Sequence, residues 1–364
     1  MVAIMADTMN QSGNGPLLES EWILDAKCVL TRGESGEIDS GVVGDPCIVW
    51  DEMIERWRMF YFAQTEGKDS TCMAISRSPD EVACGDWSKE GPVEILDESE
   101  VKSPNMVHKW WVVTDARLPN HPAKINGKYL SLFVTRIPDS EPIAHSSKVI
   151  QFAEAETLNG PWKIIPDLMI ESDCDDFVDS LNCDTPTAYW FWERDEVLIY
   201  YKAYPRRPIA ELPFSPYGSC LVSVWLDPRK RAFSAKKTVL RPQQNTWAQG
   251  WIGGLHLVCH ENGKWIGLIN ASSTPPEETC DREPAPSMGG WAICEDACPD
   301  GIWTLDTERS PFLRTENLEA TAIEAGVGVN FWRHHLLIMR SGEMRIFFNS
   351  GKYGHEQMYS LVSE

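Results

Sequence analysis

The chain of 364 residues has no apolar run of about 18 residues, the length that a membrane-spanning helix needs. Its first residues, MVAIMADTMNQSGNGP, lack the basic start and apolar stretch of a secretory signal. Basic residues are also few, since 33 Lys and Arg stand against 54 Asp and Glu, for a net charge of −21. Such a surface repels phosphate backbones and anionic lipid headgroups. We therefore expect a cytoplasmic protein with neither nucleic acid nor a membrane as partner.

Cysteines are spread thinly and without pairs. Eleven of them occur singly along the chain, an odd number with no tight spacing. The nearest two, Cys294 and Cys298 in CEDAC, lack the spacing of a zinc knuckle and have no second pair. In a chain without an export signal, this pattern indicates reduced, mostly buried thiols rather than a disulfide framework. We predict no metal site and no cofactor.

Long stretches of helical periodicity are missing as well. From about residue 40 onward, apolar and polar residues alternate with a period of two. Gly, Pro, Asn and Asp interrupt this alternation at short intervals, as turn residues do. The sequence therefore predicts an all-β protein.

Five strand-like segments repeat along the chain, each after a polar turn. They read RWRMFYFAQ, KYLSLFVTR, EVLIYYKAY, KWIGLINAS and EMRIFFNSG. At spacings of 72, 68, 68 and 79 residues, their anchor residues are Trp57, Tyr129, Val197, Trp265 and Met344. A recurring unit of this length, with several strands in each copy, is typical of a propeller.

A second series of strand-and-turn segments keeps the same period. At spacings of 75, 71 and 70 residues, its closing aromatics are Trp87, Trp162, Phe233 and Trp303. We expect the three tryptophans of this series to wedge between adjacent blades. Packing of this kind accounts for most of the sixteen tryptophans.

The two ends of the chain complement each other. The fifth unit ends with EQMYSLVSE, which corresponds to a third strand and leaves no fourth. Upstream of the first unit, EWILDAKCVLT is a strand without a repeat of its own. Pairing the two would close the ring and remove an exposed edge. We predict a disordered segment 1–16, followed by a single five-bladed β-propeller, 17–364, whose last blade is closed by an N-terminal strand.

Acids recur near the starts of the inner strands, which line the central channel of a propeller. Asp45 lies 12 residues before its anchor, Asp115 lies 14 before its own and Asp184 lies 13 before its own. Three carboxyl groups in one partly desolvated place raise one another's pKa, so one can hold a proton while another stays ionised. Cleavage of a glycosidic bond needs such a division of roles.

GDPCIVWDE, the ETLNGPWKI turn and the count of five blades resemble the five-bladed propeller glycoside hydrolases, which include arabinanases, β-xylosidases, invertases and levansucrases. The resemblance is nearest to the arabinanase and β-xylosidase branch. By position it implies Asp45 as the base, Asp115 as the residue that tunes the pKa and Asp184 as the general acid. It also implies an O-glycosidase that acts on a small soluble saccharide or glycoside.

This chain also departs from those families. CDTPTAYW stands where a Glu-Gly-Pro is usual, so the shorter Asp184 has farther to reach, and Asp176 or Asp179 are alternatives to it. TDARLP replaces the Arg-Asp-Pro of the invertase branch, whose later Glu-Cys is missing, and this favours an inverting mechanism. Three other functions stay open: a glycoside phosphorylase or transferase, acid-base isomerisation or cyclisation of a small metabolite, and a propeller that only binds.

Further polar and aromatic residues are candidates for binding substrate. His256 lies on an inner strand beside Gly253 and Gly254, and a polar supporting role suits it better than metal binding. Glu324 is a reserve acid, and Arg206 lies in a long proline-rich connection where it would bind a carboxylate or phosphate. The remaining candidates, whose indole rings would stack on a sugar or pack between blades, are Trp111, Trp190 and Trp251.

Overall fold

The computed structural model describes residues 17–25, 27–118, 120–137, 148–172, 177–205, 218–273, 287–312, 331–351 and 354–363. The segment 1–16, predicted to be disordered, lies outside these residues. Apart from the short 3-10 turns η1 (Leu17–Glu19) and η2 (Glu98–Glu100), the described regular structure consists of strands. The all-β prediction is confirmed.

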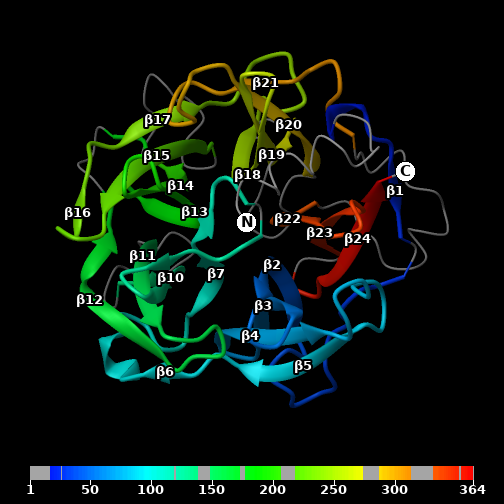
Figure 1. The fold of residues 1–364 in the computed structure, drawn as a ribbon, viewed down its shortest axis with the longest axis vertical. Coiled ribbons are helices and arrows are strands. Elements are labelled where there is room, and N and C mark those ends of the chain that lie inside the picture. The colour runs from blue at the N-terminus through cyan, green and yellow to red at the C-terminus, as the bar shows by residue number, and fades with distance from the viewer. Residues whose placement is uncertain are drawn as a thin grey trace.

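Five mainly antiparallel sheets surround a common axis like blades, and their long strands follow one another around it in chain order (Figure 1). Blade one consists of β2 (Val42–Asp51), β3 (Arg56–Thr65), β4 (Lys68–Ser76) and β5 (Trp87–Pro92). Blade two consists of β7 (His108–Val112), β10 (Lys128–Arg136), β11 (Lys148–Ala155) and β12 (Trp162–Ile170), with the short strands β6 (Ile95–Leu96) and β9 (Lys124–Ile125) at its margins.

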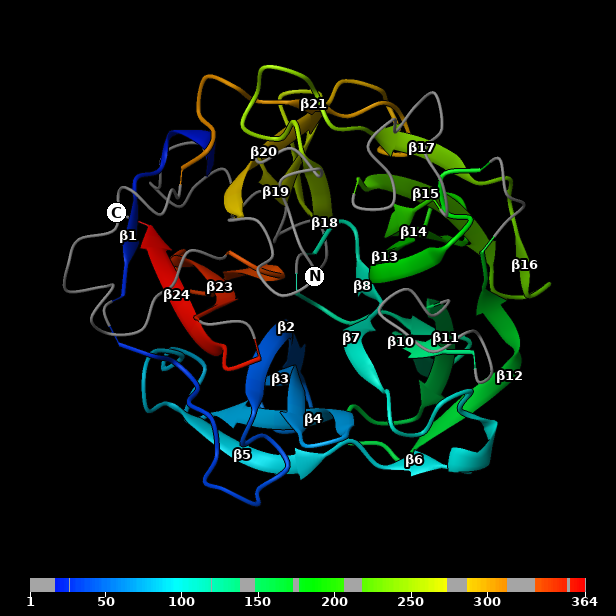
Figure 2. The same cartoon turned by 180° about the vertical axis from the view of Figure 1, so that it is seen from behind.

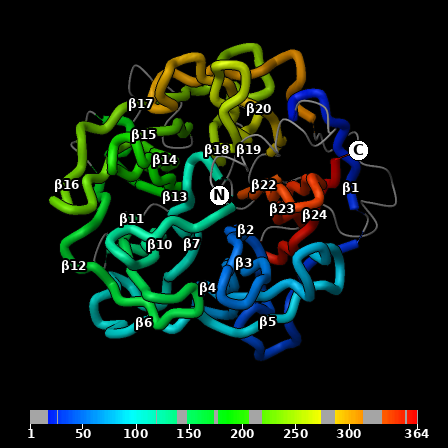
Figure 3. Tube along the Cα trace, viewed as in Figure 1, coloured from blue at the N-terminus to red at the C-terminus, as the bar shows by residue number. Residues whose placement is uncertain are grey.

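Blade three consists of β13 (Asn182–Phe191), β14 (Glu196–Tyr204), β15 (Cys220–Asp227), β16 (Ala232–Phe233) and β17 (Lys237–Leu240), and β8 (Thr114–Asp115) joins its inner strand. Blade four consists of β18 (Trp251–Glu261), β19 (Lys264–Ser272), β20 (Met288–Cys294) and β21 (Thr304–Leu305). Blade five consists of β22 (His334–Ile338), β23 (Met344–Ser350), β24 (Gln357–Ser363) and β1 (Trp22–Leu24). The tube in Figure 3 shows this circular course from blue to red.

The last blade takes its outer strand from the start of the chain. β1 pairs antiparallel with β24, so that Trp22 faces Ser363 and Leu24 faces Leu361. Past the strand, the Val29 amide donates to the carbonyl of Met358 at 2.8 Å. Figure 2 shows the blue and red strands side by side. The predicted closure of the five-bladed ring is confirmed.

Aromatic side chains fill the spaces between blades. Trp162 of blade two contacts Phe60 of blade one, with ring centroids 6.1 Å apart. Trp303, which directly precedes the last strand of blade four, lies 6.2 Å from Tyr200 of blade three. Trp87 of blade one lies 6.1 Å from a phenylalanine ring of blade five. The three tryptophans predicted to wedge between blades do so.

Buried rings also fill the middle of the channel. His256 in β18 and His335 in β22 have ring centroids 4.4 Å apart, and both lie against Trp111 of β7. Burial holds the pKa of each histidine well below its ordinary value, so both rings are neutral. No described segment forms a helix of the length and apolarity that a membrane crossing takes.

Candidate active site

The inner strands of three blades share an irregularity close to their first residues. The pairing of β2 with β3 shifts between Gly44 and Cys47, and that of β13 with β14 shifts between Asp184 and Thr187. A corresponding shift follows Ile252 in β18. Each shift is a β-bulge, which inserts an extra residue, bends the strand and redirects its side chains.

Blade two has its own bulge at Lys109, where the pairing of β7 with β10 shifts. Asp45, Lys109 and Thr185 all have left-handed backbones, with φ angles of 49°, 54° and 49°. This conformation is unfavourable for residues with a Cβ, above all for β-branched Thr185, and it is concentrated at functional sites. The repeated bulges therefore mark one end of the channel as the place to look for a site.

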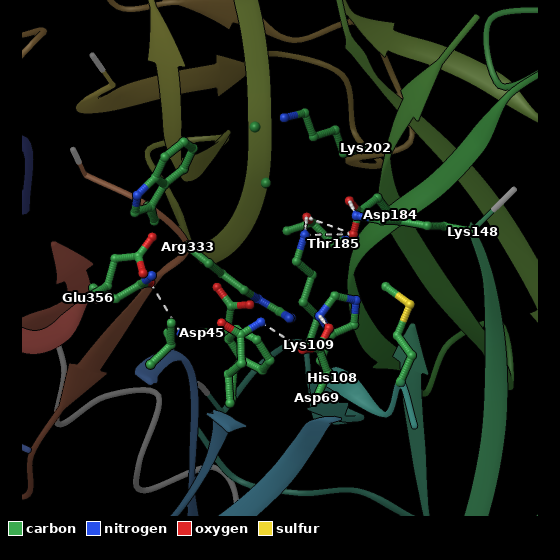
Figure 4. Close-up of a pocket in the computed structure, with 18 of the residues that line it drawn as sticks. Asp45, Asp69, His108, Lys109, Lys148, Asp184, Thr185, Lys202, Arg333 and Glu356 are labelled. Atoms are coloured by element: carbon green, nitrogen blue, oxygen red, sulfur yellow. Dashed lines mark hydrogen bonds and ion pairs between the residues drawn. The ribbon is translucent and has the colours of Figure 1, made fainter. Parts of the chain in front are cut away.

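A cavity of about 430 Å³ opens at this end of the channel (Figure 4). All five blades contribute to its wall, through the starts of inner strands, the ends of second strands and the starts of third strands. Its acidic and basic lining residues are Asp45, Asp69, His108, Lys109, Arg136, Lys148, Asp184, Lys202, Arg333 and Glu356. Its other lining residues include Phe62, Thr185, Tyr204, Gly253, Gly254, Asn270, Trp332 and Asn349.

Asp45 is one of the two predicted catalytic acids that line this cavity. Its side chain is buried, and its amide donates to Asn349 Oδ1 at 3.2 Å, which fixes the bulge against blade five. Burial raises the pKa of Asp45, whereas the nearby charges of Lys109 and Arg333 act to lower it. Burial and the two cations therefore act on the pKa of this carboxyl in opposite directions.

Asp184 lines the same cavity in a different environment. Lys109 Nζ lies 2.7 Å from one of its oxygens and Lys148 Nζ lies 2.8 Å from the other. Although burial acts to raise it, these two ammonium groups hold the pKa of Asp184 well below its usual range. An ionised carboxylate with both oxygens occupied is the reverse of what a general acid needs. The acid role predicted for Asp184 does not suit this geometry.

Glu356 is a third carboxyl in the cavity, and the sequence analysis did not select it. It directly precedes β24 and is 5% exposed, and its Oε2 has no hydrogen-bond partner among the described residues. Burial and, to a smaller extent, the charge of Asp45 raise the pKa of Glu356 to about 7. In Figure 4, Glu356 and Asp45 lie on one side of the cavity, and Asp184 and Lys148 lie on the other.

Comparison with known proteins concerns the fold. No family model matches the chain, and no curated protein matches it. Among solved structures, a glycoside hydrolase is 12% identical with a TM-score of 0.68, and the match covers 98% of this chain and 95% of that one. An α-L-arabinofuranosidase from Podospora anserina is 8% identical with a TM-score of 0.59, over 95% of this chain and 98% of that one.

A third similar structure comes from a family of mannoside phosphorylases that contains glycoside hydrolases targeting β-1,2 mannosidic linkages in Candida mannan. It is 10% identical with a TM-score of 0.60, over 94% of this chain and 93% of that one. The chain has the fold of the five-bladed propeller glycoside hydrolases. At these identities the likeness concerns the fold, and the chemistry of this propeller has to be argued from its own cavity.

The propeller places Asp115 away from the cavity. Counting back 14 residues from Tyr129 leads to Asp115, but blade two carries an insertion with β8 and β9 before its second long strand. The bulge of this blade is at Lys109, 20 residues before Tyr129. In the other three bulged blades the corresponding spacing is 12 residues, with the first bulge positions at Asp45, Thr185 and Gly253.

Asp115 pairs instead with Trp190, six residues along β13 from Asp184. At ~3.3 Å per residue, this separation is about 20 Å. There the carboxylate accepts from Trp192 Nε1 at 2.6 Å and forms an ion pair with Arg117. The expected convergence of three acids is therefore wrong for Asp115.

The other predicted binding residues lie at various depths. His256 and Trp111 belong to the buried cluster in the channel, where Leu336 donates its amide to His256 Nδ1 at 2.9 Å. Trp111 supports the cavity indirectly, because the Arg333 guanidinium lies 5.2 Å from its ring.

Two more tryptophans were predicted to bind substrate, and they lie at opposite ends of the channel wall from each other. Trp251 stacks on the lining residue Trp332, with ring centroids 6.1 Å apart. Trp190 packs against Trp192 at the opposite end of β13. Arg206 and Glu324 lie outside the described residues, and so do Asp176 and the loops that carry them.

Proposed function

We propose that this propeller cleaves glycosidic bonds in the cavity, with Asp45 and Glu356 as its pair of carboxyl groups. The observation that carries the proposal is that two buried carboxyls from different blades open into one cavity and have unlike neighbours. Glycosidases need one carboxyl to protonate the leaving oxygen and one carboxylate to activate water or attack carbon.

The charges and the burial around each carboxyl indicate which one is the acid and which is the base. Asp45 has Lys109 and Arg333 close by, and both favour its ionised form. Among the residues that the structure describes, Glu356 has no ion pair with a Lys or Arg, and burial together with the charge of Asp45 raises its pKa to about 7. Of the two carboxyls, Asp45 is therefore the one whose neighbouring charges favour the ionised form, and Glu356 is the one whose surroundings favour the proton. We assign Glu356 as the general acid and Asp45 as the base, which keeps the role that the sequence suggested for Asp45.

Asp184 has a supporting role in this proposal. Its permanent charge holds Lys109 and Lys148 at fixed positions on the wall. Ammonium groups fixed in this way can donate hydrogen bonds to sugar hydroxyls at no cost of reorganisation. Thr185, at the strained bulge next to it, also accepts from Lys109 Nζ at 3.2 Å.

The cavity volume of about 430 Å³ falls within the range of small-ligand sites and suits a small glycoside. We retain inversion as part of the proposal. It requires the two carboxyl groups to stand ~6.5 to 9.5 Å apart around the attacking water.

A panel of nitrophenyl glycosides of common sugars tests the proposal. The wild type should release nitrophenol from at least one of them, and Asp45→Asn should lose at least about 10²-fold in kcat/KM on that substrate. Asp115→Asn is the matched control, because this acid lies outside the cavity, and it should keep full turnover. Full turnover by Asp45→Asn would refute the proposal, and dependence on added phosphate would indicate a phosphorylase instead of a hydrolase.

A further inference from the structure

The cavity differs in charge from the molecule around it. The whole chain has a net charge of −21, yet the lining combines five Lys and Arg side chains with four carboxyl groups. A cationic interior in so acidic a protein needs a reason, because buried charges are costly unless they are paired.

Three of these cations surround a single anion. Lys109, Lys148 and Lys202, the lysine cluster, come from β7, β11 and β14, and Asp184 lies among them. Two of the three bind its oxygens directly, at 2.7 and 2.8 Å, while Lys202 is the cross-strand partner of Asp184 in the sheet. Asp45 also acts on Lys109, so the two carboxylates compensate at most two of the three ammonium groups and leave Lys202 as the remaining one.

Lys202 is the member of the cluster without a carboxylate. Within the described part of the chain it has no ion-pair partner, and its Nζ faces the rings of Trp251 and Tyr204 at 4.4 and 4.7 Å from their centroids. Rings of this kind hold an ammonium group in place while leaving its hydrogen-bonding directions available.

Arg333 is a second cation with unused donors. Its side chain is buried, and one nitrogen, Nη2, donates to the carbonyl of Pro186 at 2.5 Å. Its Nε and Nη1 have no partner among the residues that the structure describes. A buried guanidinium that lines a cavity with two free donors is suited to an oxyanion.

We propose that the lysine cluster and Arg333 form an oxyanion-binding wall, and that the substrate is a glycoside carrying a carboxylate of the uronic-acid type. The inference rests on the proposed function, since it names a substrate class for the same cavity. A sugar carboxylate would supply the missing negative charge near Lys202. With its carboxylate there, the sugar ring would lie beside Asp45 and Glu356.

Direct binding tests this inference without any need for turnover. Titration calorimetry would compare glucuronate, galacturonate and mannuronate, each with its neutral parent sugar, on the wild type near pH 6.5. At least one uronate should bind about tenfold or more tighter than its parent, a difference of about 1.4 kcal/mol that one charge-assisted hydrogen bond can supply. Lys202→Met should reduce this preference to about twofold or less, and Lys202→Arg should restore most of it.

Lys163→Met is the matched control, because Lys163 is an exposed lysine on an outer strand of blade two, away from the cavity. It should leave the preference for the uronate unchanged. Equal binding of every uronate and its parent would overturn the inference, as would a preference that survives Lys202→Met. Inorganic phosphate that binds more tightly than any uronate would assign the wall to free phosphate and overturn the substrate class.

The two proposals can fail separately. Turnover of neutral glycosides by the wild type, without any preference for uronates in binding, would leave the cleavage proposal intact and remove the oxyanion wall. Uronate binding that depends on Lys202, in a protein that releases nitrophenol from none of the panel and none of its uronide counterparts, would do the reverse.

Discussion

Asp45 and Glu356 show how neighbours give similar side chains different chemistry. Both are buried at the same cavity, but Asp45 has two cations near it, whereas Glu356 lies among backbone groups and beside Asp45. Glu356 was missed in the sequence because HEQ at the start of a strand resembles an ordinary turn, and its burial depends on a blade formed by both ends of the chain.

The raised pKa of Glu356 predicts a pH dependence of stability. The folded chain keeps this proton up to about pH 7, whereas the unfolded chain loses it near pH 4.5, so the free energy of unfolding falls with rising pH across that window. Glu356→Gln cannot ionise. It should therefore stabilise the protein by up to about 3 kcal/mol at about pH 8 and by little at about pH 4.

Calorimetric melting at both pH values measures this effect. Glu66→Gln, at an exposed turn position, is the control and should give the same small difference at both. An equal effect of Glu356→Gln at the two pH values would show that Glu356 does not keep its proton in the folded chain.

Lys202 predicts a pH dependence of binding. Burial lowers the pKa of Lys202 to about 7, with Asp184 acting to raise it and Lys109 and Lys148 acting to lower it. A bound carboxylate favours the protonated amine, so uronate affinity should fall about tenfold or more between about pH 6 and pH 9. Glu356 ionises in the same range, so the measurement belongs in the Glu356→Gln background. There, Lys202→Arg should remove the decline, and an unchanged decline would contradict the role of Lys202.

At the scale of the strands, one rule describes most of the cavity. In antiparallel blades, the start of the first strand, the end of the second and the start of the third lie at the same end of the sheet. Asp45 and Lys109 come from first strands, Lys202 from a second, and Lys148 and Glu356 lie at or next to the start of third strands. The three catalytic acids were predicted from the first strands alone, so Lys202, Lys148 and Glu356 on the other strands were not expected.

Gly253 is required by the bulge of blade four. A Cβ at this position would overlap the side chain of Asn270, whose Oδ1 accepts the amide of Gly254 at 2.9 Å. Gly253→Ala should therefore destabilise the protein by about 1–3 kcal/mol in denaturant unfolding. The same change made in an Asn270→Ala background should cost clearly less, because the obstructing side chain is gone. Equal costs in both backgrounds would show that the overlap is not the cause.

At the scale of the whole molecule, the ring depends on its N-terminal strand. β24 would be an unpaired edge without β1, and the buried side chains of Val29 and Leu30 would be lost with it. Deleting residues 1–31 should lower the unfolding temperature and cause association that increases with concentration. Light scattering and thermal melting measure both effects.

Ile23→Thr is the control for this deletion, since Ile23 is 43% exposed and a threonine keeps the strand pairing. It should melt close to the wild type and stay monodisperse. A truncated chain that melts and scatters like the wild type would show that closure by β1 contributes little.

The ring was predictable from the sequence and the site only in part. Anchors such as Trp57 and Trp265 recur once per blade and gave the count, because each blade has to bury the same kinds of strands, and the unmatched strands at the two chain ends gave the closure. Asp45 and Asp184 were placed at the right end of the channel. Asp115 was not placed there, because the insertion in blade two lengthens the spacing between the bulge and the anchor Tyr129 by eight residues. Only the pairing of β7 with β10 shows this longer spacing.

Leaving-group dependence of turnover tests the central claim most directly. It compares dinitrophenyl and phenyl glycosides of the sugar that the panel identifies, and only the phenyl leaving group needs a proton from the enzyme. Glu356→Gln should lose about 10²-fold or more in kcat on the phenyl glycoside and little on the dinitrophenyl one, while Asp45→Asn should lose activity on both. Undiminished hydrolysis of the phenyl glycoside by Glu356→Gln would contradict the account.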